Sequence, residues 1–370
     1  MKDKQVEKLI KMEEKRQNSV INLIASENYV SKDVLAALGS VLTNKYAEGY
    51  PGRRYYGGNS IIDKVEQLAI DRALRLFGLS SKSWNANVQA LSGSPANLAV
   101  YSAFVPIGGK IMGLKLSSGG HLTHAQSVSM TGKIWKPVLF EVDPKTELLN
   151  YEVIKSLAVK EKPDLIVVGF TAYPRIIDFK KFRKIANACG AHLHVDMSHF
   201  AGLVAGGVYP SPFPFADSVM TTTHKTLRGP RHALIFVKKD KRELDRKIDK
   251  AIIPGLQGGP HENTIAAVAV ALKEASSLSF RRYAKQVVKN AKVLADSLAA
   301  LGWRVVSGGT DSHLILVDTW ASGISGKEAS DRLEKAGIIV NMNTIPGDSR
   351  TVMDPSGIRL GTAAETTEGK

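Results

Sequence analysis

Short apolar segments alternate with helical segments through the middle of the chain, and this alternation limits the possible folds more than any other feature. Residues 165–170 are typical of a buried strand, and residues 179–189 of a helix that ends at Gly190. Further strands are predicted at 192–196, 218–223 and 233–237. Short strands separated by helices or loops favour an α/β sheet with much parallel pairing.

A smaller α+β domain is predicted after this sheet. Between residues 284 and 301, apolar side chains recur at helical spacing and form one face of a long helix, which Gly302 ends. Strands are then predicted at 304–306, 314–317 and 338–340, with a helix at 327–336. We therefore expect a helical arm (1–50), a large α/β domain (51–270) and a small C-terminal domain (271–370). Because the chain stops at Lys370 before any final helices, we expect the small domain to be incomplete.

The net charge of +15 could indicate a nucleic-acid-binding protein, but the basic residues are scattered along the sequence. Nucleic-acid-binding domains usually cluster Lys and Arg on one face or within a known motif. The mixed-charge run 238–243, which we expect to be helical, illustrates the scatter. We therefore predict a generally basic surface that attracts anionic substrates, and no nucleic-acid partner.

Targeting and redox features favour the cytoplasm. Residues 1–16 mix charged with apolar residues and lack the continuous apolar core of a secretory signal. No apolar run approaches the length of a membrane span. The single cysteine, Cys189, excludes an intramolecular disulfide and a thiolate cluster for zinc. We predict a cytoplasmic protein without a membrane partner.

The most specific local feature is the segment 221–231, where a β-branched strand ends in a polar loop that carries Lys225. Ligands of open α/β sheets bind at the carboxyl ends of the strands. A lysine there can form a Schiff base if enough of it is neutral, and cations such as His224, Arg228 or Arg231 would favour the neutral amine. A solvated loop lysine is the alternative, and it is the commoner case for a lysine considered alone.

Asp196 closes the apolar strand 192–196, so its carboxylate should also project from the end of the sheet. A carboxylate against the pyridine nitrogen of pyridoxal phosphate keeps that nitrogen protonated, and the ring can then withdraw electrons from a carbanion. An aspartate that caps the following segment is the alternative. A strand-end aspartate followed by a strand-end lysine favours the cofactor interpretation.

Residues 92–100 offer a site for a phosphate group. Glycine and serines precede a helix-forming run, and Pro95 is well placed as the first helical residue. Backbone N–H groups at such a helix start bind anions. A plain helix cap is the common alternative. Residues 255–260 form a second glycine-rich loop that could approach an anion.

Two further side chains could serve the same ligand. His121 could stack on a flat ring, and its spacing from His124 also suits a metal pair. Because no carboxylate or thiolate pattern completes such a pair, we predict no metal site. Arg359 lies between glycines in an apolar segment, where its guanidinium could bind a carboxylate through two hydrogen bonds. A structural ion pair is an equally good interpretation of this arginine.

These segments together resemble serine hydroxymethyltransferase, and the match extends over essentially the whole chain. The matching motifs are residues 23–28, 44–52, 54–58, 119–124, 195–197, 221–231, 258–260 and 307–311. The resemblance implies a pyridoxal-phosphate enzyme with the type I fold of aspartate aminotransferase. It also implies a homodimer, or a dimer of dimers, with shared active sites and with serine, glycine and a folate as substrates.

The resemblance further implies roles for individual residues. Lys225 would carry pyridoxal phosphate as a Schiff base, with Asp196 at the pyridine nitrogen and His121 stacked on the ring. Gly93, Ser94 and Gly259 would serve the phosphate. Other cofactor contacts or catalytic groups would be Tyr46, Tyr56, Thr171, His199, Thr222 and His224.

The substrates have their own implied contacts. Glu48 is similar to the family's proton-transfer residue, and Tyr46 and Glu48 would reach in from a neighbouring subunit. The serine carboxylate region would be held by Ser26, Tyr56 and Arg359. The folate region would be formed by Leu116, Gly120, Leu122 and Asn343.

The implied reaction converts serine and tetrahydrofolate to glycine and 5,10-methylenetetrahydrofolate, and it is reversible; a related pterin could take the place of tetrahydrofolate. Two alternatives stay open. One is a folate-independent aldolase of threonine or another 3-hydroxy amino acid on the same fold, which tetrahydrofolate would not accelerate. The other is a catalytically weakened relative that binds RNA, which would stay colourless with added cofactor and bind RNA more weakly as salt rises.

Overall fold

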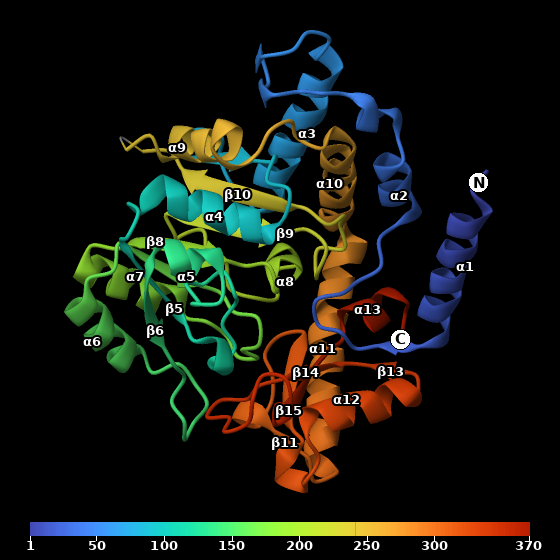
Figure 1. Ribbon diagram of the computed structural model, residues 1–370, viewed down its shortest axis with the longest axis vertical. Coiled ribbons are helices and arrows are strands. Elements are labelled where there is room, and N and C mark those ends of the chain that lie inside the picture. Colours follow the sequence, from blue (N-terminus) through green and yellow to red (C-terminus); the bar gives the residue numbers. More distant parts are fainter. Residues whose placement is uncertain (241) are drawn as a thin grey trace.

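A seven-stranded sheet forms the centre of the larger unit of the chain (Figure 1). The computed structural model describes residues 1–240 and 242–370. The strand order is β4-β10-β9-β8-β7-β5-β6. Strands β6, β5, β7, β8 and β9 pair in parallel, whereas β10 pairs antiparallel with both β9 and β4. The strands are β4 (Trp84–Asn87), β5 (Lys110–Leu114), β6 (Lys136–Phe140), β7 (Leu165–Val168), β8 (His192–Asp196), β9 (Ser218–Thr222) and β10 (Ala233–Lys238).

The prediction of a mostly parallel α/β sheet is therefore confirmed. The strands predicted at 192–196, 218–223 and 233–237 agree with β8, β9 and β10 to within one residue. The helix predicted at 179–189 is α7 (Phe179–Cys189), and Gly190 follows it in the left-handed conformation that the C-terminal glycine rule requires.

Helices cover both faces of the sheet, because successive side chains of a buried strand point to opposite faces. On one face, Leu165 and Val167 pack in a cluster with α4 (Gly93–Phe104) and α9 (Leu244–Lys250). On the other face, Ile166 and Val168 pack in a second cluster. The helices of that second cluster are α3 (Ser60–Leu76), α6 (Tyr151–Glu161), α7, α8 (Ala201–Ala205) and α10 (Glu262–Ala275).

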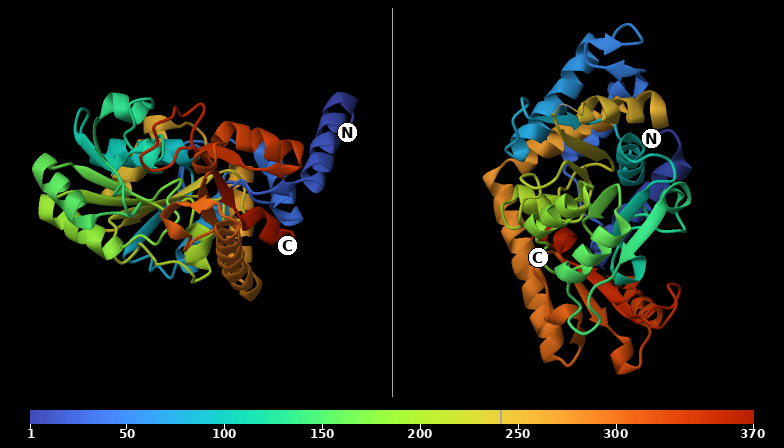
Figure 2. Two further views of the ribbon diagram at one scale, coloured as in Figure 1. Left: turned by 90° about the horizontal axis from the view of Figure 1, so that it is seen from below. Right: turned by 90° about the vertical axis from the view of Figure 1, so that its left-hand side faces the viewer.

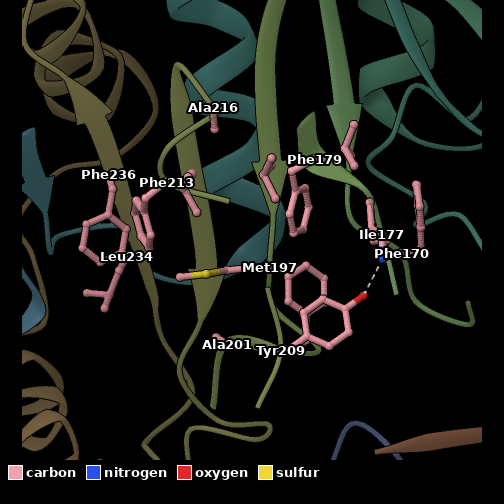
Figure 3. Packing of buried hydrophobic residues seen from close by; sticks show 14 of the residues in the cluster. Phe170, Ile177, Phe179, Met197, Ala201, Tyr209, Phe213, Ala216, Leu234 and Phe236 are labelled. Carbon is pink, nitrogen blue, oxygen red and sulfur yellow. Dashed lines mark hydrogen bonds between the residues drawn. The ribbon is translucent and has the colours of Figure 1, made fainter. Parts of the chain in front are cut away.

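Aromatic side chains fill the second face (Figure 3). Phe213 lies edge-to-face on Phe236 with ring centroids 5.3 Å apart, and Tyr209 stacks on Phe200 at 4.7 Å. The Tyr209 hydroxyl accepts a hydrogen bond of 3.1 Å from the backbone N–H of Ile177. Each aromatic pair contributes about 0.5–1.5 kcal/mol beyond its burial. This packing supports β8 and β9 from the side opposite α4.

The smaller unit is built on an antiparallel sheet in the order β11-β12-β15-β14. The long helix α11 (Leu278–Ala300) and α12 (Gly326–Lys335) pack on it, as predicted for a small α+β unit. The two-residue strand β1 (Ile21–Asn22) pairs in parallel with β13 (Ile338–Ile339), so the N-terminal segment joins this unit. The remaining strands are β11 (Arg304–Val305), β12 (Leu314–Asp318), β14 (Asn341–Asn343) and β15 (Gly357–Gly361), and α13 (Ala363–Thr367) follows them.

The N-terminal helix stands apart from both units (Figure 2). This helix, α1 (Lys4–Ser19), buries none of its residues, although Val6, Leu9 and Ile10 are apolar. After α1 and β1 the chain continues through α2 (Lys32–Leu38) to the hairpin of β2 (Gly49–Tyr50) and β3 (Arg53–Arg54). Among the described residues, no helix combines the length and the apolar character needed to cross a membrane.

Two local predictions are wrong. The run 238–243 is not a helix: Lys238 ends β10 and α9 begins at Leu244, while Lys241 lies outside the described residues. Asp240 instead makes a turn, in which its carboxylate accepts a hydrogen bond from the Arg242 N–H at 2.8 Å. Pro95 is the third residue of α4, not the first. Proline is tolerated there because N–H groups of the first turn have no partner within the helix.

Candidate active site

The carboxyl ends of β7, β8 and β9 lead into a polar cavity of about 170 Å³, where a single water needs only about 10–15 Å³. Predicted site residues that line it are Gly93, Ser94, His121, Thr171, Asp196, His199, Thr222, His224 and Lys225. Residues that line it without having been predicted are Gly169, Phe170, Ser198 and Met220. The lining residues therefore come from five separate segments of the sequence, 92–94, 121–124, 169–171, 196–199 and 220–231.

The pairing of β8 with β9 brings Asp196 and Lys225 to the same edge of the sheet. In the parallel register Asp196 lies beside Met220, two residues before the end of β9. Lys225 follows in the loop, and its Nζ donates to Thr222 Oγ1 at 2.9 Å. The Asn28 side chain donates to the Lys225 carbonyl at 2.9 Å and so fixes the backbone of this loop.

The surroundings of the Lys225 amine lower its pKa and so weaken its hold on a proton. Burial, aided by the charges of Arg359 and Arg231, lowers its pKa to about 8, although Asp196 acts in the opposite direction. A lysine with this pKa has a neutral, nucleophilic fraction near neutral pH. Two of the cations predicted to help do not contribute. Burial lowers the pKa of His224 to about 3, so this ring is neutral, and the Arg228 guanidinium lies 4.9 Å from the Tyr283 ring centroid.

The Asp196 carboxylate is buried but ionised. Burial by itself would raise its pKa, yet hydrogen bonds from His124 and Ser198 and the electrostatic influence of His124 and His121 outweigh burial and hold the pKa well below its ordinary value. Oδ2 accepts from Asn97 Nδ2 at 2.9 Å and from His124 Nε2 at 3.2 Å. Oδ1 accepts from the Ser198 hydroxyl at 2.5 Å and from its N–H at 3.1 Å. The backbone of Gly169 lies so close to Asp196 that a Cβ atom on residue 169 would be 1.8 Å from the Asp196 carbonyl oxygen.

The start of α4 lines one part of the cavity. Ser92, Gly93 and Ser94 line the cavity, and the Ser92 side chain makes no capping hydrogen bond to the helix. A Cβ atom on Gly93 would lie 2.7 Å from Thr222 Cγ2, so only glycine leaves this space open. The helix dipole and the free N–H groups of the first turn favour a phosphate here.

These residues fit pyridoxal phosphate. An anion cradle, an ionised carboxylate and a lysine with a neutral fraction line one cavity. His224 Nδ1, on another lining residue, is buried and has no hydrogen-bond partner among the described residues. A polar ligand in the cavity would give this atom a partner.

The same cavity contains a group of possible metal ligands. One ligand atom from each of His121, His124 and Asp196 lies within 4.8 Å of the others. Spacing in the sequence did not reveal this carboxylate, because Asp196 comes from a different strand. Its oxygens already accept hydrogen bonds from Asn97, His124 and Ser198. We therefore assign the group to the cofactor cavity, and the absence of a metal site stays a prediction.

Comparison with known proteins identifies the family. The family model described as serine hydroxymethyltransferase matches residues 1–370. A serine hydroxymethyltransferase of Desulfotalea psychrophila is 55% identical over 367 residues, which cover 99% of this chain and 84% of that protein. The chain belongs to the serine hydroxymethyltransferase family. Its members are pyridoxal-phosphate transferases of the type I fold that use tetrahydrofolate, so neither a folate-independent aldolase nor an RNA-binding relative is favoured.

Arg359 approaches the cavity from the smaller unit. It lies on β15, where its Nη1 donates to the Thr171 carbonyl at 2.8 Å and its Nε to Asn341 Oδ1 at 3.1 Å. Burial lowers its pKa only to about 10, so the guanidinium stays charged. Ser26 lies three residues after Leu23, whose carbonyl accepts a hydrogen bond from the Gly361 N–H of the same strand.

The predicted residues Tyr46, Glu48, Tyr56 and Gly259 do not line the cavity. They gather elsewhere in what we call the tyrosine cluster, defined by these four residues. The Tyr46 hydroxyl lies 3.3 Å from Glu48 Oε1, and the Tyr46 and Tyr56 ring centroids are 5.1 Å apart. A Cβ atom on Gly259 would meet the Tyr46 ring at 3.2 Å. Tyr46 is 53% exposed and Tyr56 43% exposed, so the cluster faces outward from its own chain.

The residues assigned to folate lie on two separate units. Leu116, Gly120 and Leu122 belong to the loop between β5 and α5 (Met130–Ile134), which also carries His121. Leu122 is 49% exposed. Asn343 ends β14 in the smaller unit, where its Nδ2 donates to the Thr344 carbonyl at 2.6 Å.

A buried ionic network holds the backbone of the tyrosine cluster. Arg54 Nη1 donates to the carbonyl oxygens of Ala47 at 2.8 Å and Gly49 at 3.0 Å, and Nη2 donates to Glu66 Oε1 at 2.7 Å. Glu262 is buried beside Glu66, and neither of its carboxyl oxygens accepts a hydrogen bond from a described residue. Burial and the Glu66 charge raise the pKa of Glu262 to about 9, so the neutral acid can donate to Glu66.

We expect Glu262→Gln to stabilise the protein at alkaline pH. The folded-state pKa of about 9 exceeds the ordinary 4.5, so the stability due to this proton is complete below 4.5 and is lost as the pH rises through 9. Glutamine keeps a donor toward Glu66 and has no proton to lose. In thermal unfolding, the midpoint of the variant should exceed that of the wild type by an amount that grows with pH. Glu334→Gln on the exposed side of α12 is the control, and a difference independent of pH would contradict the assignment.

Proposed function

We propose that this chain transfers the hydroxymethyl carbon of serine to tetrahydrofolate through pyridoxal phosphate held by Lys225. The observation that carries the proposal is the shared cavity of Lys225 and Asp196, at the ends of adjacent parallel strands. An amine and an ionised carboxylate can there reach two positions of one pyridine ring.

Each part of the cavity has a chemical task in this proposal. Bound pyridoxal phosphate withdraws electrons from the α-carbon of an amino acid attached to it. Lys225 would hold the cofactor through Nζ, which Thr222 Oγ1 orients. Asp196 stays ionised and so keeps the ring nitrogen protonated. Gly93 and Ser94 at the start of α4 bind the phosphate.

The substrate contacts follow the family resemblance. Arg359, Ser26 and Tyr56 hold the serine carboxylate and thereby orient the Cα–Cβ bond that breaks. Glu48 moves a proton at the serine hydroxyl. The remaining residues near the ring are His121, Thr171, His199 and His224, and the folate contacts are Leu116, Gly120, Leu122 and Asn343. Fixing the reacting bond in one orientation is worth several kcal/mol of the barrier, on the order of 7–11 kcal/mol in well-oriented systems.

Tyr46, Glu48 and Tyr56 act in this proposal in the site of a second copy of the chain. Two observations support the shared site: these residues lie outside their own cavity, and two of them are about half exposed. The exposed apolar residues of α1 also favour a second copy, because an amphipathic helix without a partner leaves apolar surface in water. We place the resulting homodimer in the cytoplasm.

The test of the reaction is serine-to-glycine conversion with and without tetrahydrofolate. We expect the purified yellow protein to form glycine from serine much faster with tetrahydrofolate than without it, because the one-carbon unit then has an acceptor. Equal rates in both conditions, with threonine cleaved as well as serine, would favour the folate-independent aldolase. A colourless protein would contradict cofactor binding itself.

Mixed dimers test whether Glu48 serves the partner's site. Lys225→Ala and Glu48→Gln should each lose most activity as homodimers. If Glu48 acts across the interface, a mixed dimer has one intact site, which combines Lys225 of one copy with Glu48 of the other. Random mixing makes half of the dimers mixed with one working site of two, so activity should return to about a quarter of wild type. Mixing Lys225→Ala with Asp196→Ala is the control, and it should recover no activity because both residues act in the site of their own chain. If mixing Lys225→Ala with Glu48→Gln also recovered no activity, Glu48 would act in the site of its own chain.

A further inference from the structure

β8 carries polar side chains on the sheet face that α4 covers. His192, His194 and Asp196 alternate with Leu193 and Val195, which point to the opposite, apolar face. Both histidines are buried, and His194 has no exposed surface. A buried polar group without a hydrogen bond destabilises a fold, so two histidines in this layer require partners. The neighbouring α4 and β9 supply them.

A continuous chain of hydrogen bonds joins the two histidines to Asp196. His192 Nε2 lies 2.9 Å from Ser218 Oγ, which lies 2.8 Å from His194 Nδ1. His194 Nε2 lies 3.1 Å from Asn97 Oδ1. Asn97 Nδ2 lies 2.9 Å from Asp196 Oδ2. We call His192, Ser218, His194 and Asn97 the histidine relay.

The proton positions along the histidine relay follow from its last bond. An ionised carboxylate only accepts hydrogen bonds, so Asn97 presents its NH₂ group to Asp196 and its carbonyl to His194. His194 therefore donates from Nε2, and as a neutral ring it accepts at Nδ1 from the Ser218 hydroxyl. Burial keeps both rings neutral, because it lowers the pKa of His194 to about 3 and that of His192 to about 4. All four bonds then point toward Asp196.

Asn97 is also linked through Thr123 to a ring that lines the cavity, that of His121. Its Nδ2 lies 2.8 Å from Thr123 Oγ1, which lies 2.7 Å from His121 Nδ1. The Thr123 N–H donates to the same His121 nitrogen at 3.2 Å, so this nitrogen carries no proton. The Asn97 amide therefore binds Asp196 directly and is joined to His121 through Thr123.

We propose that His194 is a positioning residue for the cofactor pocket: by donating to Asn97 Oδ1, it fixes the amide whose NH₂ group binds Asp196. Without that donor, the Asn97 carbonyl would be buried without a partner. The amide could then turn its oxygen toward the Asp196 carboxylate, where the two acceptors repel each other. The inference rests on the proposed role of Asp196 at the ring nitrogen.

The test compares wild type with two variants. His194→Leu fills the space of the ring but has no hydrogen-bond donor for Asn97 Oδ1, whereas His194→Gln keeps a donor. The measurements are the affinity for pyridoxal phosphate, the visible absorbance spectrum, and kcat and KM for serine. We expect His194→Leu to weaken cofactor binding by about 10- to 100-fold, as for a buried acceptor left unpaired. Its spectrum and kcat should change while KM does not. His194→Gln should recover most of the affinity.

Tyr101→Phe is the matched control for burial and packing. The Tyr101 ring lies against His194 with centroids 6.1 Å apart, and its buried hydroxyl has no hydrogen-bond partner among the described residues. This variant should bind the cofactor as wild type does. Wild-type affinity and spectrum in a folded His194→Leu protein would overturn the inference.

Two further measurements keep the result interpretable. If His194→Leu does not fold, ¹⁵N spectra of histidine-labelled wild type show which ring nitrogen of His194 carries the proton. The His194 signals are those that are absent from the spectrum of His194→Gln. A proton on Nδ1 instead of Nε2 would overturn the inference. Asp196→Asn separates it from the proposed function. Unchanged cofactor affinity in Asp196→Asn would refute the role of Asp196. If Asp196→Asn lost cofactor affinity but His194→Leu did not, only the role of the histidine relay would be refuted.

Discussion

We expect the Lys225→Ala variant to fold normally but to retain no pyridoxal phosphate after borohydride reduction and denaturation. Among the described residues, no other lysine lines the cavity, so no second amine can replace Nζ. Asp196 and the start of α4 remain, and the cofactor should still bind without a covalent bond and with an altered spectrum. Serine turnover should fall by about 10²- to 10⁴-fold, the range for loss of one essential proton-transferring group. Mass spectrometry of the reduced protein measures the attachment.

Lys285→Ala provides the matched control for Lys225→Ala. Lys285 is an exposed residue of α11, so its loss should change neither the covalent attachment nor the turnover. The assignment of Lys225 would be wrong if the reduced Lys225→Ala protein carried the cofactor in the same amount as wild type. It would also be weakened by a general loss of thermal stability, because the fold and not the amine would then explain the missing activity.

Lys225 and Asp196 could be predicted from sequence because each lies at the end of a strand-forming segment: Asp196 closes β8, and Lys225 lies in the loop after β9. The carboxyl ends of neighbouring parallel strands share one edge of a sheet, so strand-end polar residues meet even when they are far apart in the chain. The same reasoning finds Gly93 and Ser94, because glycine and serines before a helix-forming run mark a helix start. These predictions depend on local pattern and on a general property of α/β sheets.

The partners of Asp196 could not be predicted in this way. Asn97 reaches it only because α4 packs on the face of β8, and no spacing in the sequence encodes that contact. Ser198 had a local signal, since an aspartate often accepts a hydrogen bond from the N–H two residues later. The carboxylate near His121 and His124 was missed for the same reason as Asn97: it comes from a separate strand.

The tyrosine cluster shows a different limit. Its members Tyr46, Glu48 and Tyr56 were assigned to the site by family resemblance, and a single chain places them outside the cavity. No pattern within one sequence specifies which surface of a second copy a residue meets. Mixed dimers therefore test these residues more directly than the fold of one chain does.

The hydrogen bonds of Arg359 favour a substrate-binding role over a structural ion pair. A structural ion pair would join it to a carboxylate, but its hydrogen bonds go to two neutral acceptors, the Thr171 carbonyl and Asn341 Oδ1. These two hydrogen bonds use Nε and Nη1 of the guanidinium. The guanidinium is buried and charged, and its charge lowers the pKa values of Lys225 and His199. A buried cation without a carboxylate partner is prepared to bind an anionic ligand.

We expect Arg359→Ala to raise KM for serine and the dissociation constant of glycine by at least about 30-fold, because losing one partner of a desolvated charge pair costs about 2–5 kcal/mol. Arg359→Lys should recover only part of this affinity, because an ammonium group cannot bind a carboxylate with a planar fork. Cofactor affinity should stay near wild type, which separates substrate binding from damage to the cavity. Arg304→Ala is the control: this arginine of the same unit pairs with Glu147 and Asp318, so its loss should lower stability without changing KM. If Arg359→Ala bound serine as tightly as wild type does, Arg359 would serve only its contacts with Thr171 and Asn341 and would not bind the substrate.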